Sequence, residues 1–167
     1  MFQGRLLAIA ICDAAALPLR LAPTITAVAG QGLAGDRYFA GKGIGQKAPA
    51  KPEQEVTLVE AEAIAAANAD YKLSLTHLDT RRNLLTEGVP LNHLVGKTFR
   101  VGPALLRGIE LCEPCGHLEK LTCQGVKRAL LHRGGLRAQI LQGGELQPGD
   151  VISLAEEVMS PAPSSPS

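Results

Sequence analysis

Two cysteines three residues apart, Cys112 and Cys115, stand in the part of this chain that is richest in reactive side chains. Pro114 fixes a turn between an apolar run that ends at Leu111 and a short amphipathic stretch at 116–121. Backbone N–H groups at a helix start stabilise negative charge, so a cysteine there can ionise enough to ligate a soft metal or carry sulfur. Cys115 fits that position best.

Glu113 opposes this chemistry, because a nearby carboxylate disfavours a second negative charge unless a cation or a bound metal compensates for it. Three other interpretations of the cysteines remain open. The first is apolar filling of a core, which suits Cys12 at the end of an apolar strand. The second is a thioredoxin-like redox pair, although the expected βαβ setting is absent. The third is a zinc site made from Cys112, Cys115, Cys123 and either His117 or His132.

Arginines predict a separate site for an anion. Arg81, Arg82 and Asn83 run directly into an apolar strand, and guanidinium groups bind phosphate with two parallel hydrogen bonds. Neighbouring residues of a strand point to opposite faces, so we expect one of the two arginines, but not both, to reach a pocket. A glycine-rich turn at 32–38 could also bind an anion, through Gly35, Asp36 and Arg37. The segment 132–137 has the same two possible interpretations, an anion site or an ordinary turn. An ordinary turn and a solvated strand end are the competing interpretations.

Eighteen glycines and eleven prolines separate many short apolar stretches, which is typical of a mostly β barrel or sandwich. We expect one longer helix at about 57–69, capped by Thr57 with Glu60 reaching back, and short helices at 116–121 and 126–132. The loop 40–52 is expected to be exposed and mobile. The prediction is one domain, 1–157, followed by a disordered Pro- and Ser-rich tail, 158–167. The expected strands are 5–11, 23–28, 54–58, 83–86, 98–101, 104–110, 136–141 and 151–154.

Charge and composition exclude several classes of function. Seventeen basic residues nearly balance sixteen acidic ones, and aromatic residues make up 3%, so we expect no nucleic-acid partner. No apolar run approaches the length of a membrane span, and the chain start lacks the layout of a signal peptide. We therefore expect a cytoplasmic protein without a membrane partner. Four cysteines in a chain of this length predict local thiol chemistry rather than a disulfide scaffold.

The order of the segments resembles the MOSC family, named for the C-terminal domain of molybdenum-cofactor sulfurase. The likeness runs from Gly-Leu-Ala-Gly-Asp-Arg-Tyr at 32–38 through 57–63 and 81–84 to Glu-Pro-Cys at 113–115, and it closes at 133–138 and 143–150. It covers nearly the whole chain and implies a mostly β barrel with peripheral helices. Cys112 is a departure, since a thiol three residues before Cys115 is not a general feature of the family.

The resemblance implies that Cys115 either ligates the molybdenum of a molybdopterin cofactor or carries sulfur as a persulfide. It also places Arg81, Arg82 and Asn83 where relatives contact the pterin and its phosphate, and it gives the 32–38 loop a part in shaping the pocket. No pyridoxal phosphate is expected in this chain, because the desulfurase domain that carries it in fused relatives is absent, as is the additional N-terminal barrel of others.

Three hypotheses follow. In the first, the chain is a component of a molybdenum-dependent reductase of N-hydroxylated compounds, with a small-molecule substrate and a separate redox partner. In the second, it is a sulfur carrier that a separate cysteine desulfurase loads at Cys115. In the third, it is a binding or adaptor module that has lost the chemistry, and replacement of Cys115 then changes nothing.

Overall fold

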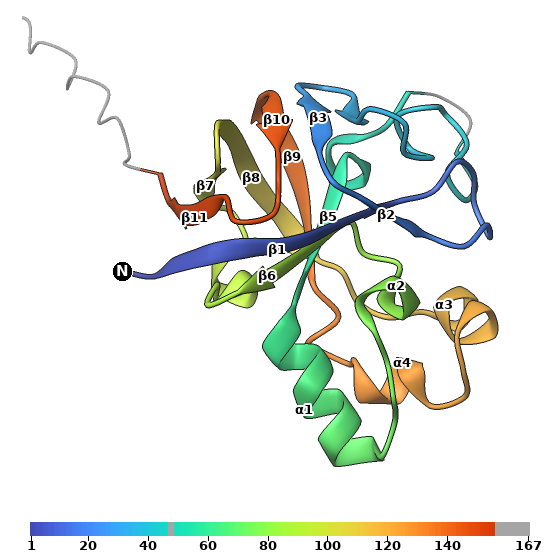
Figure 1. Ribbon diagram of the computed structural model, residues 1–167. Helices are drawn as coiled ribbons and strands as arrows, with labels where there is room; N and C mark the ends of the chain where they lie inside the picture. Colours follow the sequence, from blue (N-terminus) through green and yellow to red (C-terminus); the bar gives the residue numbers. More distant parts are fainter. Residues whose placement is uncertain (47–48, 156–167) are drawn as a thin grey trace, which may run out of the picture.

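Strand β1 (Gln3–Ile11) illustrates how the sequence pattern builds the sheet, because its first residues alternate between exposed and buried positions. The structure, a computed structural model, describes residues 1–46 and 49–155. Within that part, the main sheet has the order β11–β7–β8–β9–β5–β6–β1–β2, and β11 also pairs with β1. That pairing closes a mostly β barrel of seven strands, as expected (Figure 1).

The strands of the barrel are β1, β5 (Val56–Glu60), β6 (Leu84–Glu87), β7 (Thr98–Val101), β8 (Ala104–Leu111), β9 (Leu136–Gln142) and β11 (Val151–Leu154). Strand β2 (Arg20–Ala22) extends the sheet beyond β1. A second, smaller sheet consists of β10 (Gly144–Leu146), β3 (Ile25–Val28) and β4 (Gly32–Leu33), and its buried residues share the core of the barrel. The three short strands β2, β4 and β10 were not predicted, although the expected strand 23–28 contains β3.

The barrel interior is filled by branched aliphatic side chains and one aromatic ring, all fully buried: Leu6, Ile9, Leu58, Leu84, Phe99, Leu106, Leu136, Ile140 and Ile152. Parallel pairing of β5 with β6 sets the register Leu58 to Leu84 and Val59 to Leu85. Because side chains alternate along a strand, Leu58 faces the barrel interior while Val59 packs in a second core outside it.

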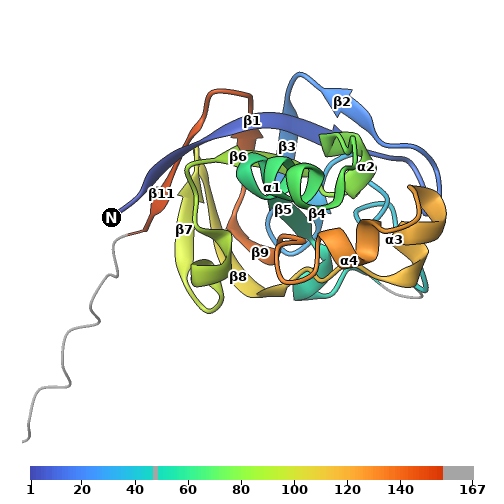
Figure 2. The ribbon, with the colours of Figure 1, turned by 90° about the horizontal axis from the view of Figure 1, so that it is seen from below.

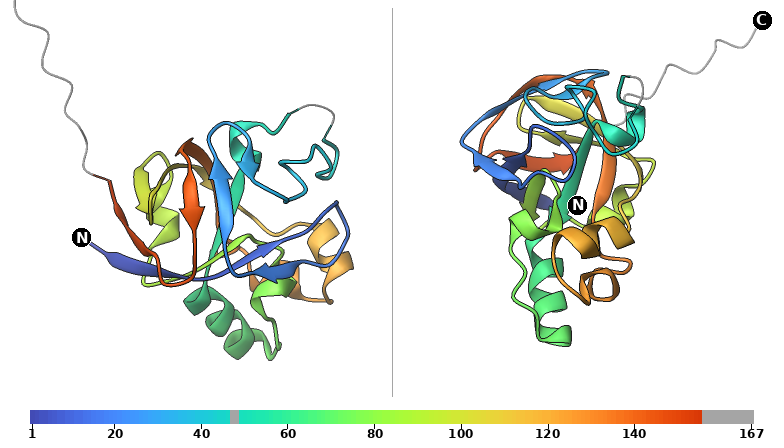
Figure 3. Two further views of the ribbon diagram at one scale, coloured as in Figure 1. Left: turned by 45° about the horizontal axis from the view of Figure 1, so that its top comes forward. Right: turned by 90° about the vertical axis from the view of Figure 1, so that its right-hand side faces the viewer.

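Helices α1 (Ala61–Tyr71), α2 (His77–Thr80), α3 (Gly116–Leu121) and α4 (Val126–Ala129) gather on one side of the barrel, as Figures 2 and 3 show. The second core joins Val59 to apolar residues of α1, α3 and α4. Two 3₁₀ turns, Pro52–Gln54 and Leu91–Leu94, complete the described elements. The prediction of α3 was correct at both ends.

The start of the longer helix was predicted wrongly. Thr57 lies inside β5, and α1 begins only at Ala61, with Glu60 as the N-cap residue. Thr57 is buried, and its hydroxyl exchanges hydrogen bonds with Asn83 in place of capping a helix. The β-branched and apolar run from Val56 to Val59 therefore favours a buried strand over the local capping signal.

The described residues of the loop 40–52 form turns and are mostly exposed, as expected. Residues 47, 48 and 156–167, which include the predicted tail, lie outside the described residues. In the part of the chain that the structure describes, no helix is long and apolar enough to cross a membrane.

Candidate functional site

Cys115 is exposed at the point where the chain leaves β8, turns at Pro114 and begins α3. Its backbone is extended, with φ −128° and ψ 173°, and its carbonyl accepts the N–H of Glu119 at 3.2 Å. Cys115 is therefore the N-cap residue of α3, as the sequence predicts. Its side chain lines a cavity of about 80 Å³, which we call the Cys115 cavity.

Four arginines line the Cys115 cavity together with Cys115: Arg37, Arg81, Arg82 and Arg137. The other lining residues are Ala15, Tyr38, Ile44, His117 and Leu118. The structure thus brings four of the predicted site residues, Cys115, Arg37, Arg81 and Arg82, to one place. These residues come from distant parts of the chain.

Arg81 and Arg82 both line this cavity, whereas strand alternation predicted that only one would. The reason is that Arg81 is not part of a strand: it ends α2 in the left-handed conformation, with φ +59°. The alternation of side chains therefore begins only after this residue. The left-handed turn allows two sequential arginines to face one cavity.

Arg82 is buried and its guanidinium group is bonded to the backbone beside Cys115. Its Nε donates to the carbonyl of Gly134 at 2.8 Å, and its Nη2 donates to the carbonyl of Cys112 at 2.9 Å. The Arg82 carbonyl lies 2.9 Å from Nε2 of His77, a buried ring. Arg82 therefore holds the Cys112–Cys115 turn to the Gly134 segment through these hydrogen bonds.

Asn83 does not line the cavity. It is 1% exposed, its Oδ1 accepts from the N–H and hydroxyl of Thr57, and its Nδ2 donates to the carbonyl of Ala10. The side chain thus connects β6 to β5 and β1. Its hydrogen bonds hold these three strands together next to the residues that line the cavity.

Gly35 and Asp36 also lie outside the cavity lining, and Asp36 holds Arg37 in place. Asp36 is fully buried, and its Oδ1 accepts from the backbone N–H of Cys12 and from Nη1 of Arg37, both at 3.2 Å. Its Oδ2 is buried without a hydrogen-bond partner. Gly35 has φ +91°, a conformation that suits glycine and makes the turn before this carboxylate.

Cys12 is buried, as its filler interpretation predicts, but its sulfur also contacts both arginines. Nη1 of Arg37 lies 3.4 Å and Nη2 of Arg81 lies 3.7 Å from the Cys12 sulfur. Nη2 of Arg37 donates to the carbonyl of Arg81 at 3.2 Å. The strand pattern did not predict these contacts, because they form only when the 32–38 turn packs against the end of β1.

Burial and neighbouring charges shift the pKa values of the two arginines in opposite directions. Burial lowers the pKa of Arg37, but the Asp36 carboxylate and Cys12 raise it by more, so the net shift is upward. Burial lowers the pKa of Arg81, and the positive charge of Arg37 lowers it further. No carboxylate among the described residues forms an ion pair with Arg81, which is half-buried.

Arg137 and His117 also line the cavity. Arg137 ends the segment 132–137, for which the sequence left an anion site or an ordinary turn open, and His117 was considered only as a zinc ligand. Arg137 lies in β9 between buried Leu136 and Ala138, so alternation points it outwards, on the other face of the strand from the barrel core. It pairs loosely with Glu110, at 3.7 Å. In the sequence, the charge of Arg137 between the apolar residues Leu136 and Ala138 indicates that its side chain leaves the barrel core.

The zinc alternative gains no support from the geometry, and Cys112 of the proposed redox pair is buried. Among the described residues, no group of three or more His, Cys, Asp and Glu side chains could hold a metal ion. All four cysteines are free, and Cys112 is buried with its N–H bonded to the carbonyl of Gly135. Cys123 packs partly buried against the second core.

Comparison with solved structures finds the same fold in proteins of low sequence identity. The YuaD protein from Bacillus subtilis superposes with a TM-score of 0.71 at 16% identity, covering 91% of this chain and 97% of that one. YiiM from Geobacillus stearothermophilus gives 0.66 at 16% identity, covering 93% and 77%. YiiM from Escherichia coli gives 0.65 at 16% identity, covering 93% and 72%.

No curated protein matches the chain. The model of the MOSC domain family, however, matches residues 45–153, which is more than half of the sequence and includes the Cys115 turn, Arg81, Arg82 and Arg137. On this match, and with the closed barrel that the strands form, the chain belongs to the MOSC domain family.

Proposed function

We propose that the chain binds a molybdenum-pterin cofactor, with Cys115 as a ligand of the metal and the arginines of the Cys115 cavity around the phosphate. One observation carries this proposal: the exposed Cys115 lines a small cavity together with four arginines. Thiolates are ligands for soft and transition metals, and guanidinium groups bind phosphate with paired hydrogen bonds. The family of the chain is associated with the same cofactor.

Charge in the cavity supports an anionic ligand. Arg37 is compensated by Asp36, and Arg137 is compensated weakly by Glu110. Arg81 and Arg82 bond to backbone carbonyls, and Arg81 also to the Cys12 sulfur; neither pairs with a carboxylate of the described chain. An anion in the cavity would therefore meet a net positive charge in a partly dehydrated site, where the attraction is stronger than in bulk water.

The residues fit part of the cofactor. A cavity of about 80 Å³ is well below the roughly 300–1,000 Å³ of pockets that enclose whole ligands. We infer that the cavity encloses only the parts of the cofactor that contact Cys115 and the arginines, and that the rest of the cofactor lies outside. When bound, the molybdenum supplies two-electron redox chemistry, here the reduction of a small N-hydroxylated compound in the cytoplasm, with electrons from a separate redox partner.

Metal analysis tests this proposal. The chain is expressed in a host that makes the cofactor, and molybdenum per protein is measured for the wild type, Cys115→Ser and Cys123→Ser. Cys123 is the matched control, because it is a partly buried thiol that does not line the cavity. We expect the wild type and Cys123→Ser to retain molybdenum and Cys115→Ser to lose it. Wild-type protein without molybdenum contradicts the proposal.

A second candidate is a sulfur carrier, and the exposure of Cys115 is the observation that favours it. A desulfurase persulfide would transfer its outer sulfur atom to the Cys115 thiolate, and the cysteine of the desulfurase would leave as a thiolate. The arginines of the cavity would then hold the persulfide anion. Intact mass after incubation with a cysteine desulfurase and free cysteine should show one added sulfur atom in the wild type and in Cys123→Ser, but not in Cys115→Ala.

The two experiments separate the hypotheses. Molybdenum without added sulfur supports the cofactor-binding protein, and added sulfur without molybdenum supports the carrier. If neither is found, the remaining hypothesis is the binding module, in which replacement of Cys115 has no effect on ligand binding.

A further inference from the structure

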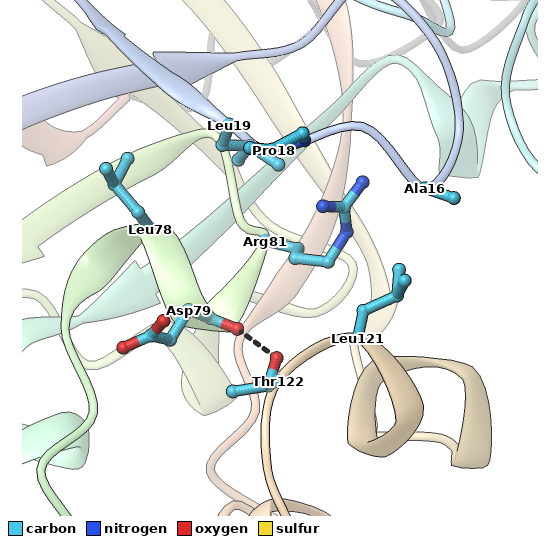
Figure 4. A pocket seen from close by; sticks show the side chains of 8 residues that line it. All are labelled: Ala16, Pro18, Leu19, Leu78, Asp79, Arg81, Leu121 and Thr122. Carbon is cyan, nitrogen blue, oxygen red and sulfur yellow. Dashed lines mark hydrogen bonds between the residues drawn. The ribbon is translucent and has the colours of Figure 1, made fainter.

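A second and larger cavity adjoins the Cys115 cavity. Its volume is about 240 Å³, and its lining residues come from three segments: the loop after β1, α2, and the end of α3. These residues are Ala16, Pro18, Leu19, Leu78, Asp79, Arg81, Leu121 and Thr122 (Figure 4). Among the described residues, Arg81 alone lines both cavities. Its side chain is therefore the wall that the two cavities share.

The Arg81 side chain extends from the end of α2 towards the loop after β1 (Figure 4). Nη1 donates to the carbonyl of Leu17 at 2.7 Å, and Nη2 contacts the Cys12 sulfur. A guanidinium group has five N–H donors, so these two bonds leave three for a ligand. The bond to Leu17 fixes the guanidinium group at the cavity. Ligand binding therefore costs less side-chain conformational entropy than it would with a freely rotating Arg81.

The one carboxylate in the cavity lining does not neutralise Arg81. Oδ2 of Asp79 accepts the N–H of Thr76 at 2.8 Å and its hydroxyl at 3.0 Å, and so caps the start of α2. Figure 4 shows this carboxylate pointing away from the guanidinium group. The Asp79 carbonyl accepts the hydroxyl of Thr122 at 2.8 Å, so the carbonyl and this hydroxyl are paired with each other. Arg81 therefore keeps a positive charge in the cavity lining that Asp79 does not neutralise.

The rest of the cavity wall is apolar. Pro18, Leu19, Leu78 and Leu121 supply apolar surface to the lining, and in Figure 4 the Leu121 side chain extends towards the Arg81 guanidinium group while Leu78 points away from it. Small-molecule sites are commonly built this way, with apolar walls and a few fixed polar groups that orient the ligand. The volume is below that of pockets for drug-sized ligands, which limits the occupant to a small molecule.

We propose that this second cavity binds a small organic carboxylate with an apolar body, such as an aromatic carboxylate, whose anionic group is bonded to Arg81. One guanidinium group balances one negative charge and matches the two oxygens of a carboxylate. Binding requires no molybdenum. The bound molecule would lie beside the Cys115 cavity, and its identification as the substrate of the reaction there rests on the proposed function.

Benzoate is the probe, and methyl NMR of the leucines in the metal-free chain is the measurement. We expect benzoate to shift the methyl signals of Leu19, Leu78 and Leu121 with a common dissociation constant. Benzamide, which has the same shape without the charge, and acetate, which has the charge without the apolar body, should each bind about tenfold more weakly or worse.

Two pairs of variants locate the site. Arg81→Gln should weaken benzoate binding by about tenfold or more, and Arg81→Lys, which keeps the charge, by less. Leu121→Trp should narrow the cavity and weaken binding, whereas Leu154→Trp in β11 should leave it unchanged. Leu121 and Leu154 are matched, since they are 38% and 36% exposed. The Leu121 pair keeps the test informative if Arg81→Gln fails to fold.

Equal affinity for benzoate and benzamide overturns the proposal, as does equal affinity for benzoate and acetate. Shifts confined to Leu118, which lines only the Cys115 cavity, overturn it too. These results are independent of the metal analysis. Absence of molybdenum with specific benzoate binding would reject the proposed cofactor but not this site, and the reverse result would reject only this site.

Discussion

Glu113 is bonded to His132, on the far side of the turn that carries Cys115. Its Oε1 accepts the backbone N–H of His132 at 2.9 Å, and its Oε2 lies 3.1 Å from Nδ1 of the same residue. The sequence predicts that Glu113 opposes negative charge at Cys115. The structure instead shows this carboxylate engaged by both the backbone N–H and the ring nitrogen of His132.

Replacement of Glu113 separates the hydrogen bond from the ion pair. His132 has φ +63°, and the Glu113 carboxylate accepts the N–H of this left-handed residue. We expect Glu113→Ala to lower the free energy of unfolding by about 1 kcal/mol through the lost acceptor. Glu113→Gln should cost less, because the His132 side chain is 78% exposed and exposed ion pairs contribute little. Urea titration measures both, and an equal loss in the two variants would assign the effect to the charge.

Asn83 is expected to matter for folding rather than for ligand contact. Asn83→Ala would leave the N–H of Thr57 and the carbonyl of Ala10 without partners in a buried place, at a cost of about 2–4 kcal/mol. Asn92→Ala is the control, since Asn92 is exposed and donates only to the carbonyl of His132. Its expected cost is below about 1 kcal/mol. Similar denaturation midpoints for the two variants would contradict the structural role.

His77 gives the protein a pH dependence of known sign. Burial lowers the pKa of His77 below its ordinary value of 6.5, despite the hydrogen bonds to the backbone near Arg82. The unfolded chain therefore takes up a proton at a higher pH than the folded chain does. Stability is fully present above about pH 6.5 and is lost as the pH falls through that value towards the lower folded pKa.

His77→Gln should remove this part of the pH dependence and keep a donor for the Arg82 carbonyl. Glu55 acts in the opposite sense, because burial raises its pKa above 4.5 and favours the folded state at lower pH. The quantity to compare is therefore the difference between variant and wild type in free energy of unfolding. As the pH falls below 6.5, the wild type should lose free energy of unfolding relative to His77→Gln. A difference that stays constant with pH would refute the role of His77 in the pH dependence.

The barrel could be predicted from sequence because its long strands alternate and its turns are marked by glycine and proline. The limits of β7 and β11 were predicted correctly for this reason. Thr57 was misjudged, since a capping pattern of Thr and Glu is local, whereas the choice of strand depends on Asn83, which lies 26 residues away. Strands of two or three residues, such as β4, carry too little pattern to be recognised.

The candidate site divides in the same way. Cys115, Arg37, Arg81 and Arg82 were identifiable by residue type, and the structure places them around one cavity. Residue type did not indicate which way each side chain points. Asn83 and Asp36 bond to neighbouring parts of the protein and support the site. The Cys12 sulfur contacts Arg37 and Arg81. These contacts cross between segments far apart in the chain, so no local periodicity predicts them.

Gly135 and Gly116 are two glycines near the Cys115 turn with opposite expected tolerance. Gly135 has φ +118°, and a Cβ there would collide with the carbonyl of Leu58, where β9 begins to pair with β5. Its own carbonyl accepts the N–H of Cys112 at 2.7 Å. Gly135→Ala must therefore separate the strands or distort the turn, and we expect a loss above about 2 kcal/mol.

Gly116 follows Cys115 directly, and apart from its chain neighbours and the backbone of its own helix, a Cβ there would meet no atom of the described residues within 4 Å. Alanine also favours a helix over glycine, so Gly116→Ala should leave the free energy of unfolding unchanged or raise it by up to about 1 kcal/mol. Thermal and urea unfolding of the two variants provides the comparison. A large loss in Gly116→Ala would mean that the chain needs the freedom of glycine beside Cys115, and a stable Gly135→Ala would mean that β9 can move away from β5 without harm.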